Sequence, residues 1–319
     1  MPWIPRAFLV PSAWVLCACA LAAADTPPGA PFMKPSPLPY QAPQFDRIND
    51  GDYLSAIEAG MKDRLARIRK IADNSAAPTF ENTIVAVERA GVLLNRASKV
   101  FSAITAANTN PTLQKIEAEL APKLAAHNDE IYLNAWLFAR IKAVHDQREH
   151  LKVGPEGRQL VERYYRDFVH AGAQLAASDQ VKLRTLNQEE SKLTTEFKNR
   201  LLAANKDGAV VVADRAGLKG LSEGEIDAAA MDAKARSLEG KFLLPLQNTT
   251  QQPALASLVD RSVRERLFKA SVNRADQGKA NDTRALVLRL GQLRAERPAC
   301  SGTGTTPPTP CPPRWPRHL

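Results

Sequence analysis

Residues 52–72 have the sequence DYLSAIEAGMKDRLARIRKIA, in which apolar side chains return every three or four positions. Ile57, Met61, Leu65 and Ile68 form one stripe of the helix that this spacing predicts. A helix with one apolar stripe must bury it against other elements. The stretch therefore predicts a core helix of a helical protein.

The same periodicity predicts further helices, whose starts are marked by capping residues and prolines. These helices are expected over 79–101, from Pro111, after Asn134, from Pro155 to about Ala204 with a junction near 178–179, and over 222–236, 253–275 and 282–297.

Two short segments interrupt the helical pattern. Residues 209–213, AVVVA, are β-branched, and residues 241–246, KFLLPL, form an apolar run that Pro245 brings to an end. We expect the pair to form a small β-ribbon. The predicted fold class is therefore mostly α, a multi-helix domain over 49–297 with one β-ribbon near 209–246.

Composition agrees with a folded helical body. The chain has 319 residues, of which 44% are hydrophobic, so it can bury a core. Only 6% are aromatic, which favours helices over an all-β sandwich. The formal charge is +9, but Arg6, Arg314 and Arg317 lie near the two ends of the chain. The body has only a mild basic bias, which does not indicate a nucleic-acid partner.

Residues 1–24 are typical of a secretory signal peptide. Arg6 precedes an apolar run over 7–23, and three alanines precede Asp25 as a cleavage site. We therefore expect a periplasmic or secreted protein with no membrane partner after cleavage. The alternatives are a membrane anchor and a lipoprotein acylated at Cys19.

The Pro-rich residues 25–48 are expected to be an extended, linker-like lead.

Residues 298–319 change character abruptly. They contain seven prolines and no acidic residue, and they follow a helical pattern that Pro298 cannot continue. One explanation is translation in a shifted reading frame, so that the native chain continued past residue 297; the other is a genuine Pro-rich tail.

Outside the leader and this tail the chain has no cysteine, which excludes disulfides, Cys-ligated zinc and a Cys nucleophile in the body.

Residues 220–224, GLSEG, match the G-x-S-x-G pattern of serine hydrolases. The pattern needs a strand directly before it and a histidine after it, but only His318 in the tail follows Ser222. Ser222 with Glu225 three positions later fits a helix capping box. The capping function is therefore expected, and a serine hydrolase is the more distant hypothesis.

The other candidate residues also have structural explanations. No H-E-x-x-H occurs, and His145 and His150 are five positions apart, so they diverge around a helix. His127 beside Asp129 is expected to be solvated, and His170, with Asp167 one turn back, is expected to be a surface imidazole.

Two further groups have similar structural interpretations. Glu189 and Glu190 are expected to be surface charges of a helix rather than an acid/base pair. Tyr164, Tyr165 and Phe168 are expected in the core rather than in a nucleic-acid patch with Arg163 and Arg166. No catalytic, cofactor-binding or metal-binding residue is predicted in this chain.

Several stretches, taken in order, resemble the N-terminal half of the thimet oligopeptidase-like zinc metallopeptidases, in particular their bacterial peptidyl-dipeptidase branch. The stretches are SPLPY at 36–40, PQFD at 43–46, PTFENTI at 78–84, APKLAAH at 121–127, VERYYRDF at 161–168 and LLPLQNTT at 243–250.

The resemblance implies a mostly helical protein in which two halves form the walls of a deep channel. It implies a zinc ion held by the two histidines of an H-E-x-x-H helix and a downstream glutamate, with the motif glutamate as general base. Short unfolded peptides would be the substrates, and the branch releases C-terminal dipeptides. Those residues belong to the other half of the family chain, so none is carried over to a position here.

The first hypothesis is therefore the channel-wall portion of an exported peptidyl-dipeptidase. We expect this chain alone to bind no zinc and to cleave nothing, with the missing catalytic half as a possible partner. The alternative is an exported helical binding or scaffold protein with a Pro-rich tail.

Overall fold

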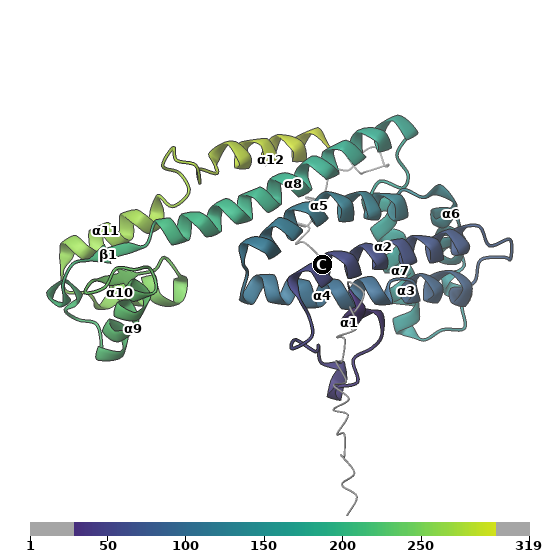
Figure 1. Ribbon diagram of the computed structural model, residues 1–319. Coiled ribbons are helices and arrows are strands. Elements are labelled where there is room, and N and C mark those ends of the chain that lie inside the picture. Colours follow the sequence, from purple (N-terminus) through teal and green to yellow (C-terminus); the bar gives the residue numbers. More distant parts are fainter. Residues whose placement is uncertain (1–28, 298–319) are drawn as a thin grey trace, which may run out of the picture.

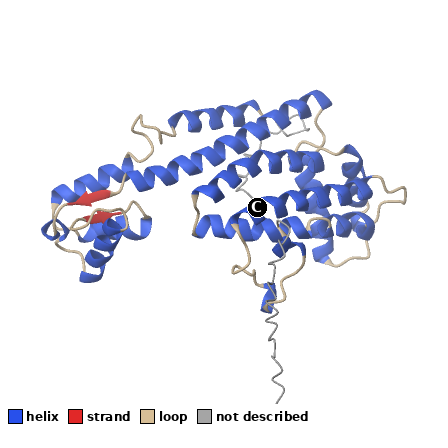
Figure 2. Cartoon of the chain, viewed as in Figure 1, coloured by secondary structure: helices blue, strands red, loops and turns tan. Residues whose placement is uncertain are grey.

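The computed structural model describes residues 29–297; the expected signal segment, the tail, His318 and all four cysteines lie outside this range. In the described part the chain is mostly helical, with one two-stranded sheet (Figure 2). The mostly helical fold class with a small β-ribbon is confirmed. None of the helices described is both long and apolar enough to cross a membrane.

The chain forms a helical bundle and a smaller lobe, and one long helix connects the two (Figure 1). The bundle consists of α1 (Ala30–Met33), α2 (Asp50–Ala72), α3 (Ala86–Arg89), α4 (Val92–Ala107), α5 (Pro111–Tyr132), α6 (Ala135–Asp146) and α7 (Pro155–His170). The connecting helix α8 (Ala177–Asp207) has 31 residues. The lobe consists of β1 (Val210–Val212), α9 (Glu223–Lys234), β2 (Phe242–Leu244), α10 (Asn248–Ser257) and α11 (Arg261–Val272), and α12 (Arg284–Glu296) then returns along α8.

Most helix starts coincide with the predicted caps. The side chains of Asn110, Asn134 and Ser222 each accept a hydrogen bond from the first turn of the helix that follows. Thr79 does the same for a π-helical turn over Phe80–Val85.

Three predicted helix boundaries are wrong. The helix expected over 79–101 is interrupted at Gly91, whose helix propensity is low and which packs against the Arg64 side chain. The junction expected near 178–179 lies earlier, at 171–176, where Gly172 has a φ of 97°. The helix expected over 253–275 begins earlier, at Asn248, with Pro253 inside it, and it is divided because Asp260 caps a new helix, α11.

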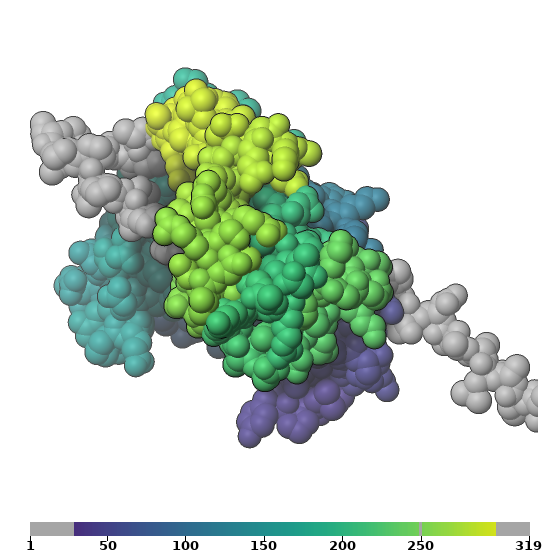
Figure 3. All heavy atoms as spheres, turned by 90° about the vertical axis from the view of Figure 1, so that its left-hand side faces the viewer, coloured from purple at the N-terminus to yellow at the C-terminus, as the bar shows by residue number. Residues whose placement is uncertain are grey.

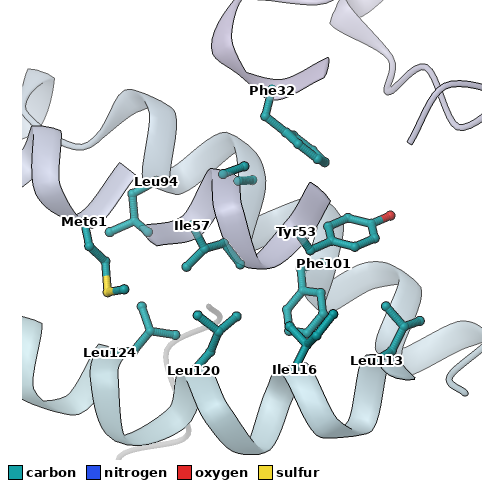
Figure 4. Packing of buried hydrophobic residues seen from close by; sticks show 12 residues of the cluster. Phe32, Tyr53, Ile57, Met61, Leu94, Phe101, Leu113, Ile116, Leu120 and Leu124 are labelled. Atoms are coloured by element: carbon teal, nitrogen blue, oxygen red, sulfur yellow. The ribbon is translucent and has the colours of Figure 1, made fainter. Parts of the chain in front are cut away.

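The first core cluster joins α1, α2, α4 and α5 (Figure 4). Its aromatic members are Phe32, Tyr53 and Phe101, whose rings contact one another in sequence at centroid distances of 5.5 and 5.3 Å. The presence of Phe32 in this core differs from the linker-like lead expected for residues 25–48. The side chain of Arg96 also donates a hydrogen bond to the Phe32 carbonyl, which fixes this part of the lead on the bundle.

Two further core clusters complete the molecule. The second joins the C-terminal half of α2 to α3, α6 and α7, and the third fills the lobe. In the lobe β1 and β2 pair antiparallel, with Val210 opposite Leu244 and Val212 opposite Phe242. The predicted ribbon is therefore confirmed, and α9 lies between its two strands in the sequence.

Candidate functional site

Ser222 is a helix cap and not a nucleophile at a strand end. Residues Arg215–Leu218 form a short 3-10 helix between β1 and the serine, so no strand leads directly into it. Ser222 Oγ donates to Glu225 Oε2 at 2.6 Å, and the Ser222 N–H donates to the same oxygen at 2.7 Å. These bonds hold the pKa of Glu225 below its usual range.

Gly220 in the same motif has a backbone function. Its φ is 105°, and a Cβ there would lie 2.1 Å from the carbonyl oxygen of Ser257. The glycine that suggested a hydrolase motif is therefore required because the C-terminal residue of α10, Ser257, lies so close to the backbone at this position. The capping box prediction is confirmed.

The histidines are dispersed over the bundle. His145 Nε2 lies 2.9 Å from Glu162 Oε2, and its ring stacks on Tyr165 at a centroid distance of 3.9 Å. His145 therefore holds α6 against α7. His150 and His170 are exposed and lie on other elements.

His127 is not solvated, contrary to the prediction. Its side chain is 3% exposed, and neighbouring Asp129 is 8% exposed. Tertiary packing buries this side chain: α5, which carries His127, lies between α2 and α8. Burial, with the charge of Arg64 nearby, lowers the pKa of His127 to about 4, so its ring is neutral near pH 7.

Glu189 and Glu190 lie on α8 and bind arginines of α12 and of its C-terminal cap, Arg297. The guanidinium of Arg289 donates to both carboxylate oxygens of Glu189, at 2.7 and 2.9 Å. Glu190 accepts hydrogen bonds from Arg294 and Arg297. Arg289 lowers the pKa of Glu189, so this carboxylate stays ionised. The two glutamates fasten α8 to the C-terminal helix, and the pKa of Glu189 is lowered rather than raised as in a catalytic acid.

The aromatic cluster on α7 belongs to the core, as predicted. Phe168 is fully buried and contacts Tyr132 at a centroid distance of 4.9 Å. Burial and the nearby Glu88 carboxylate raise the pKa of Tyr164. Arg163 binds Glu88 at 2.8 Å. These rings therefore do not form a stacking platform for bases.

Arg140 is a polar core residue that the sequence reasoning missed. It is 7% exposed and donates to the carbonyls of Asn74 and Ala76 and to the side chain of Asn82. Arg140 lies one turn after Leu137 on the apolar stripe of α6, and this position indicates that its side chain is buried. Arg140 fixes the loop between α2 and the π-helical turn.

The described residues do not fit the zinc ion that the resemblance implies. Among them no three His, Cys, Asp or Glu side chains come together in a group that could hold a metal. His145 has acidic partners, but its Nε2 already interacts with Glu162. No reaction step through a metal is therefore assigned to this part of the molecule.

One hollow of the described surface lies at the start of α7. It has a volume of about 360 Å³ and is lined by charges of both signs, including Arg148, Glu149, Arg158 and Glu162. Arg148 and Glu162 are within 3.5 Å of each other, so their charges largely compensate. The hollow presents neither a nucleophile with its base nor a group of metal ligands.

Comparisons with known proteins show that the chain is similar to part of several bacterial peptidases. It is 48% identical over 272 residues to the dipeptidyl carboxypeptidase of Escherichia coli K12, a match that covers 85% of this chain and 40% of the relative. It is 47% identical over 264 residues to the dipeptidyl carboxypeptidase of Salmonella typhimurium, covering 83% of this chain and 39% of that protein. The oligopeptidase A of E. coli is 23% identical over 241 residues, which are 75% of this chain and 35% of the relative.

No family model matches the chain. The chain spans about 40% of the length of the dipeptidyl carboxypeptidases that it matches.

Proposed function

The chain belongs to the thimet oligopeptidase-like family, and from this membership we propose that residues 29–297 form the N-terminal, channel-wall part of a peptidyl-dipeptidase. The complete enzyme would release C-terminal dipeptides from short peptides. The observation that carries the proposal is the 48% identity to a dipeptidyl carboxypeptidase over most of this chain.

The architecture supports a structural contribution to the enzyme. The long helix α8 holds a helical bundle and a separate lobe in one elongated body (Figure 1). Buried apolar clusters and ion pairs between helices account for the side chains that suggested chemistry. We propose that this part supplies shape and restricts peptide access, while another part of the enzyme supplies the reaction and its zinc ion.

A chimera tests this proposal. Residues 29–297 replace the matching segment of the E. coli dipeptidyl carboxypeptidase, and release of dipeptide from an N-blocked tripeptide is measured. We expect chelator-sensitive release by the chimera and none by the 319-residue chain alone. Robust, chelator-sensitive release by the chain alone would contradict the proposal. A folded chimera without activity would favour the alternative of a helical binding or scaffold protein.

We also propose that the protein is exported to the periplasm or beyond. The support is the sequence of residues 1–24, with an apolar run after Arg6 and alanines before Asp25. The test fuses residues 1–40 to a reporter that is active only after export. We expect an active reporter whose mature N-terminus is Asp25. A reporter retained in the cytoplasm would overturn the assignment, and a mature N-terminus at acylated Cys19 would favour the lipoprotein.

A further inference from the structure

The Pro-rich lead contains a loop that is exposed and uncharged. Residues 35–45, PSPLPYQAPQF, contain no acidic or basic side chain, and their polar side chains are one serine and two glutamines. Tyr40 is fully exposed, and Leu38 and Phe45 are 42% and 56% exposed. We call residues 35–45 the lead loop. Single apolar residues are common on protein surfaces, but three in one short uncharged segment are typical of a contact surface.

Both ends of the lead loop are fixed to the bundle. Before it, Phe32 lies in the first core cluster, and its carbonyl accepts a hydrogen bond from Arg96. After it, Ile48 packs against the same cluster, and Asn49 forms the capping box of α2. Figure 1 and Figure 3 show this segment, in purple, projecting from the lower side of the bundle. The exposed side chains are therefore presented at a defined place on the molecule.

The turn at the tip of the loop has a strained backbone. Tyr40 and Gln41 have φ values of 57° and 56°, in the left-handed region that residues with a Cβ rarely adopt. Such a conformation persists where the surrounding structure determines it. Within the described part of the chain the turn is held by local backbone bonds, such as the one from the Gln41 N–H to the Leu38 carbonyl at 2.9 Å. The exposed ring of Tyr40 adds no packing to them, so the turn has the character of an element that is completed by a further contact.

The family resemblance indicates what makes this contact. Two of the six stretches that carry the resemblance, SPLPY at 36–40 and PQFD at 43–46, fall on this segment. In the other four stretches apolar side chains are buried within this chain, as Ile84 and Phe168 are. Packing within the described part therefore explains the family-like residues of those four stretches, but not those of the lead loop. The remaining explanation is the part of the family chain that lies outside the match, since 272 matched residues are only 40% of the E. coli relative.

From these observations we infer that the lead loop docks on the catalytic part of a dipeptidyl carboxypeptidase, the part of the relatives that lies outside the match. The inference rests on the proposed function and adds the contact surface. In the assembled enzyme the ring of Tyr40 fills an apolar recess of that part, and Leu38 and Phe45 pack beside it. Docking then removes three apolar side chains from water and holds the strained turn in place.

Thiol labelling tests the inference. Tyr40→Cys is introduced into the 319-residue chain with its four native cysteines replaced by serine, and into the chimera described above. Mass spectrometry assigns the adduct to residue 40 from the mass of its peptide, and residues 29–297 contain no native cysteine. Two reference positions accompany it: Met231→Cys on α9 is exposed, and Ser98→Cys on α4 is buried and nearly isosteric.

We expect maleimide to label residue 40 at least about tenfold more slowly in the chimera than in the chain alone. Residue 231 should react at similar rates in both, and residue 98 should stay slow in both, which shows that each protein is folded. Equal rates at residue 40 would overturn the inference. Slow labelling of residue 40 in the chain alone would also overturn it, because a second copy or another segment of this chain then covers the loop.

A pair of alanine substitutions provides a second measurement. Tyr40→Ala removes the ring, and Gln41→Ala is the matched control, because it shortens an exposed polar side chain in the same left-handed turn. Tyr40→Ala should lower the Tm of the chimera by about 3 °C or more and leave that of the chain alone unchanged. Gln41→Ala should leave both unchanged. An equal Tm for the two chimera variants would contradict the inference, even if the cysteine variant folds poorly.

The outcomes separate this inference from the proposed function. A chimera that releases dipeptide but labels rapidly at residue 40 retains the proposed function and refutes the docking of the lead loop. An inactive chimera in which residue 40 is protected supports the docking and contradicts the proposed function.

Discussion

Gly60 shows how a single missing side chain allows two helices to pack. It is buried on α2, and a Cβ at this position would lie 2.7 Å from both the backbone nitrogen and the Cα of Leu94 on α4. Contacts this short with a backbone can be relieved only by moving the helix. The absence of a side chain, rather than a special backbone conformation, is therefore what this position requires.

Gly60→Ala is expected to lower the free energy of unfolding by about 1–3 kcal/mol, because the added methyl group forces α2 and α4 apart. Urea denaturation of the full chain measures the change. Gly51→Ala in the same helix is the matched control, because nothing lies within 4 Å of its Cβ position. It should leave stability unchanged or raise it by up to about 1 kcal/mol. Equal destabilisation by both substitutions would refute the steric explanation.

His127 makes stability depend on pH. Its two ring nitrogens are buried without a hydrogen-bond partner in the described structure, and its pKa is lowered to about 4 from the usual 6.5. Between these values the unfolded chain binds a proton that the folded chain does not. The contribution of His127 to the free energy of unfolding is therefore fully present above about pH 6.5 and is lost as the pH falls towards 4.

We expect the free energy of unfolding to fall between pH 6.5 and pH 4, with a contribution from His127 on the order of 2 kcal/mol. His127→Leu should reduce this fall, because leucine has no proton to bind. His170→Leu, which changes an exposed histidine, should leave it intact. Urea unfolding at several pH values provides the measurement, and an unchanged fall in His127→Leu would assign the effect to other groups.

Among the elements, the connection between α2 and α3 depends on a residue from α6. Arg140 donates to the carbonyls of Asn74 and Ala76 at 2.6 and 2.9 Å and to Asn82 Oδ1 at 3.0 Å. Asn82 and Thr79 also form the capping box that starts the π-helical turn. One guanidinium therefore holds the loop and the start of the next helix in a single arrangement.

Arg140→Met is expected to lower the free energy of unfolding by about 2–4 kcal/mol, because the carbonyls of Asn74 and Ala76 and the side chain of Asn82 then lose the donor that holds the loop. Arg158→Met on α7 provides a control, since Arg158 is exposed. This second change should stay within about 0.5 kcal/mol. Chemical denaturation followed by circular dichroism compares the two. A small effect of Arg140→Met would show that the loop retains its arrangement without the arginine.

At the scale of the whole molecule, helices α2, α5, α8 and α12 lie in successive layers, and the lobe extends from the far end of α8 (Figure 1). The lobe has its own core, which includes Val212, Leu218 and Leu267. The two core clusters of the bundle share no residue with it. This separation predicts that the lobe can unfold while the bundle stays folded.

Leu267→Ala tests this separation, because Leu267 is fully buried in the lobe. The cavity should destabilise the lobe by about 2–5 kcal/mol. Hydrogen exchange followed by mass spectrometry should then show faster exchange in β1, α9 and α11, with α2 and α4 unchanged. Equal acceleration in both bodies would show that the molecule unfolds as one unit.

Much of the fold could be predicted from local patterns. Apolar periodicity located the helices, and Asn110, Asn134 and Ser222 marked their starts, because a capping side chain binds the backbone of its own first turn. The helix breaks at Gly91 and before Asp260 were missed. An apolar stripe can continue across such a break, so periodicity alone does not reveal it.

Local sequence patterns are enough to predict the helical class, the β-ribbon, the capping function of Ser222 and the core position of Phe168, because each follows from contacts within a few residues or from side-chain periodicity. Three other features follow only from how the helices pack: His127 is buried, Arg140 holds a distant loop, and Glu189 and Glu190 fasten α12 to α8. These properties depend on which helices pack against each other, and residues far apart in the chain determine that packing.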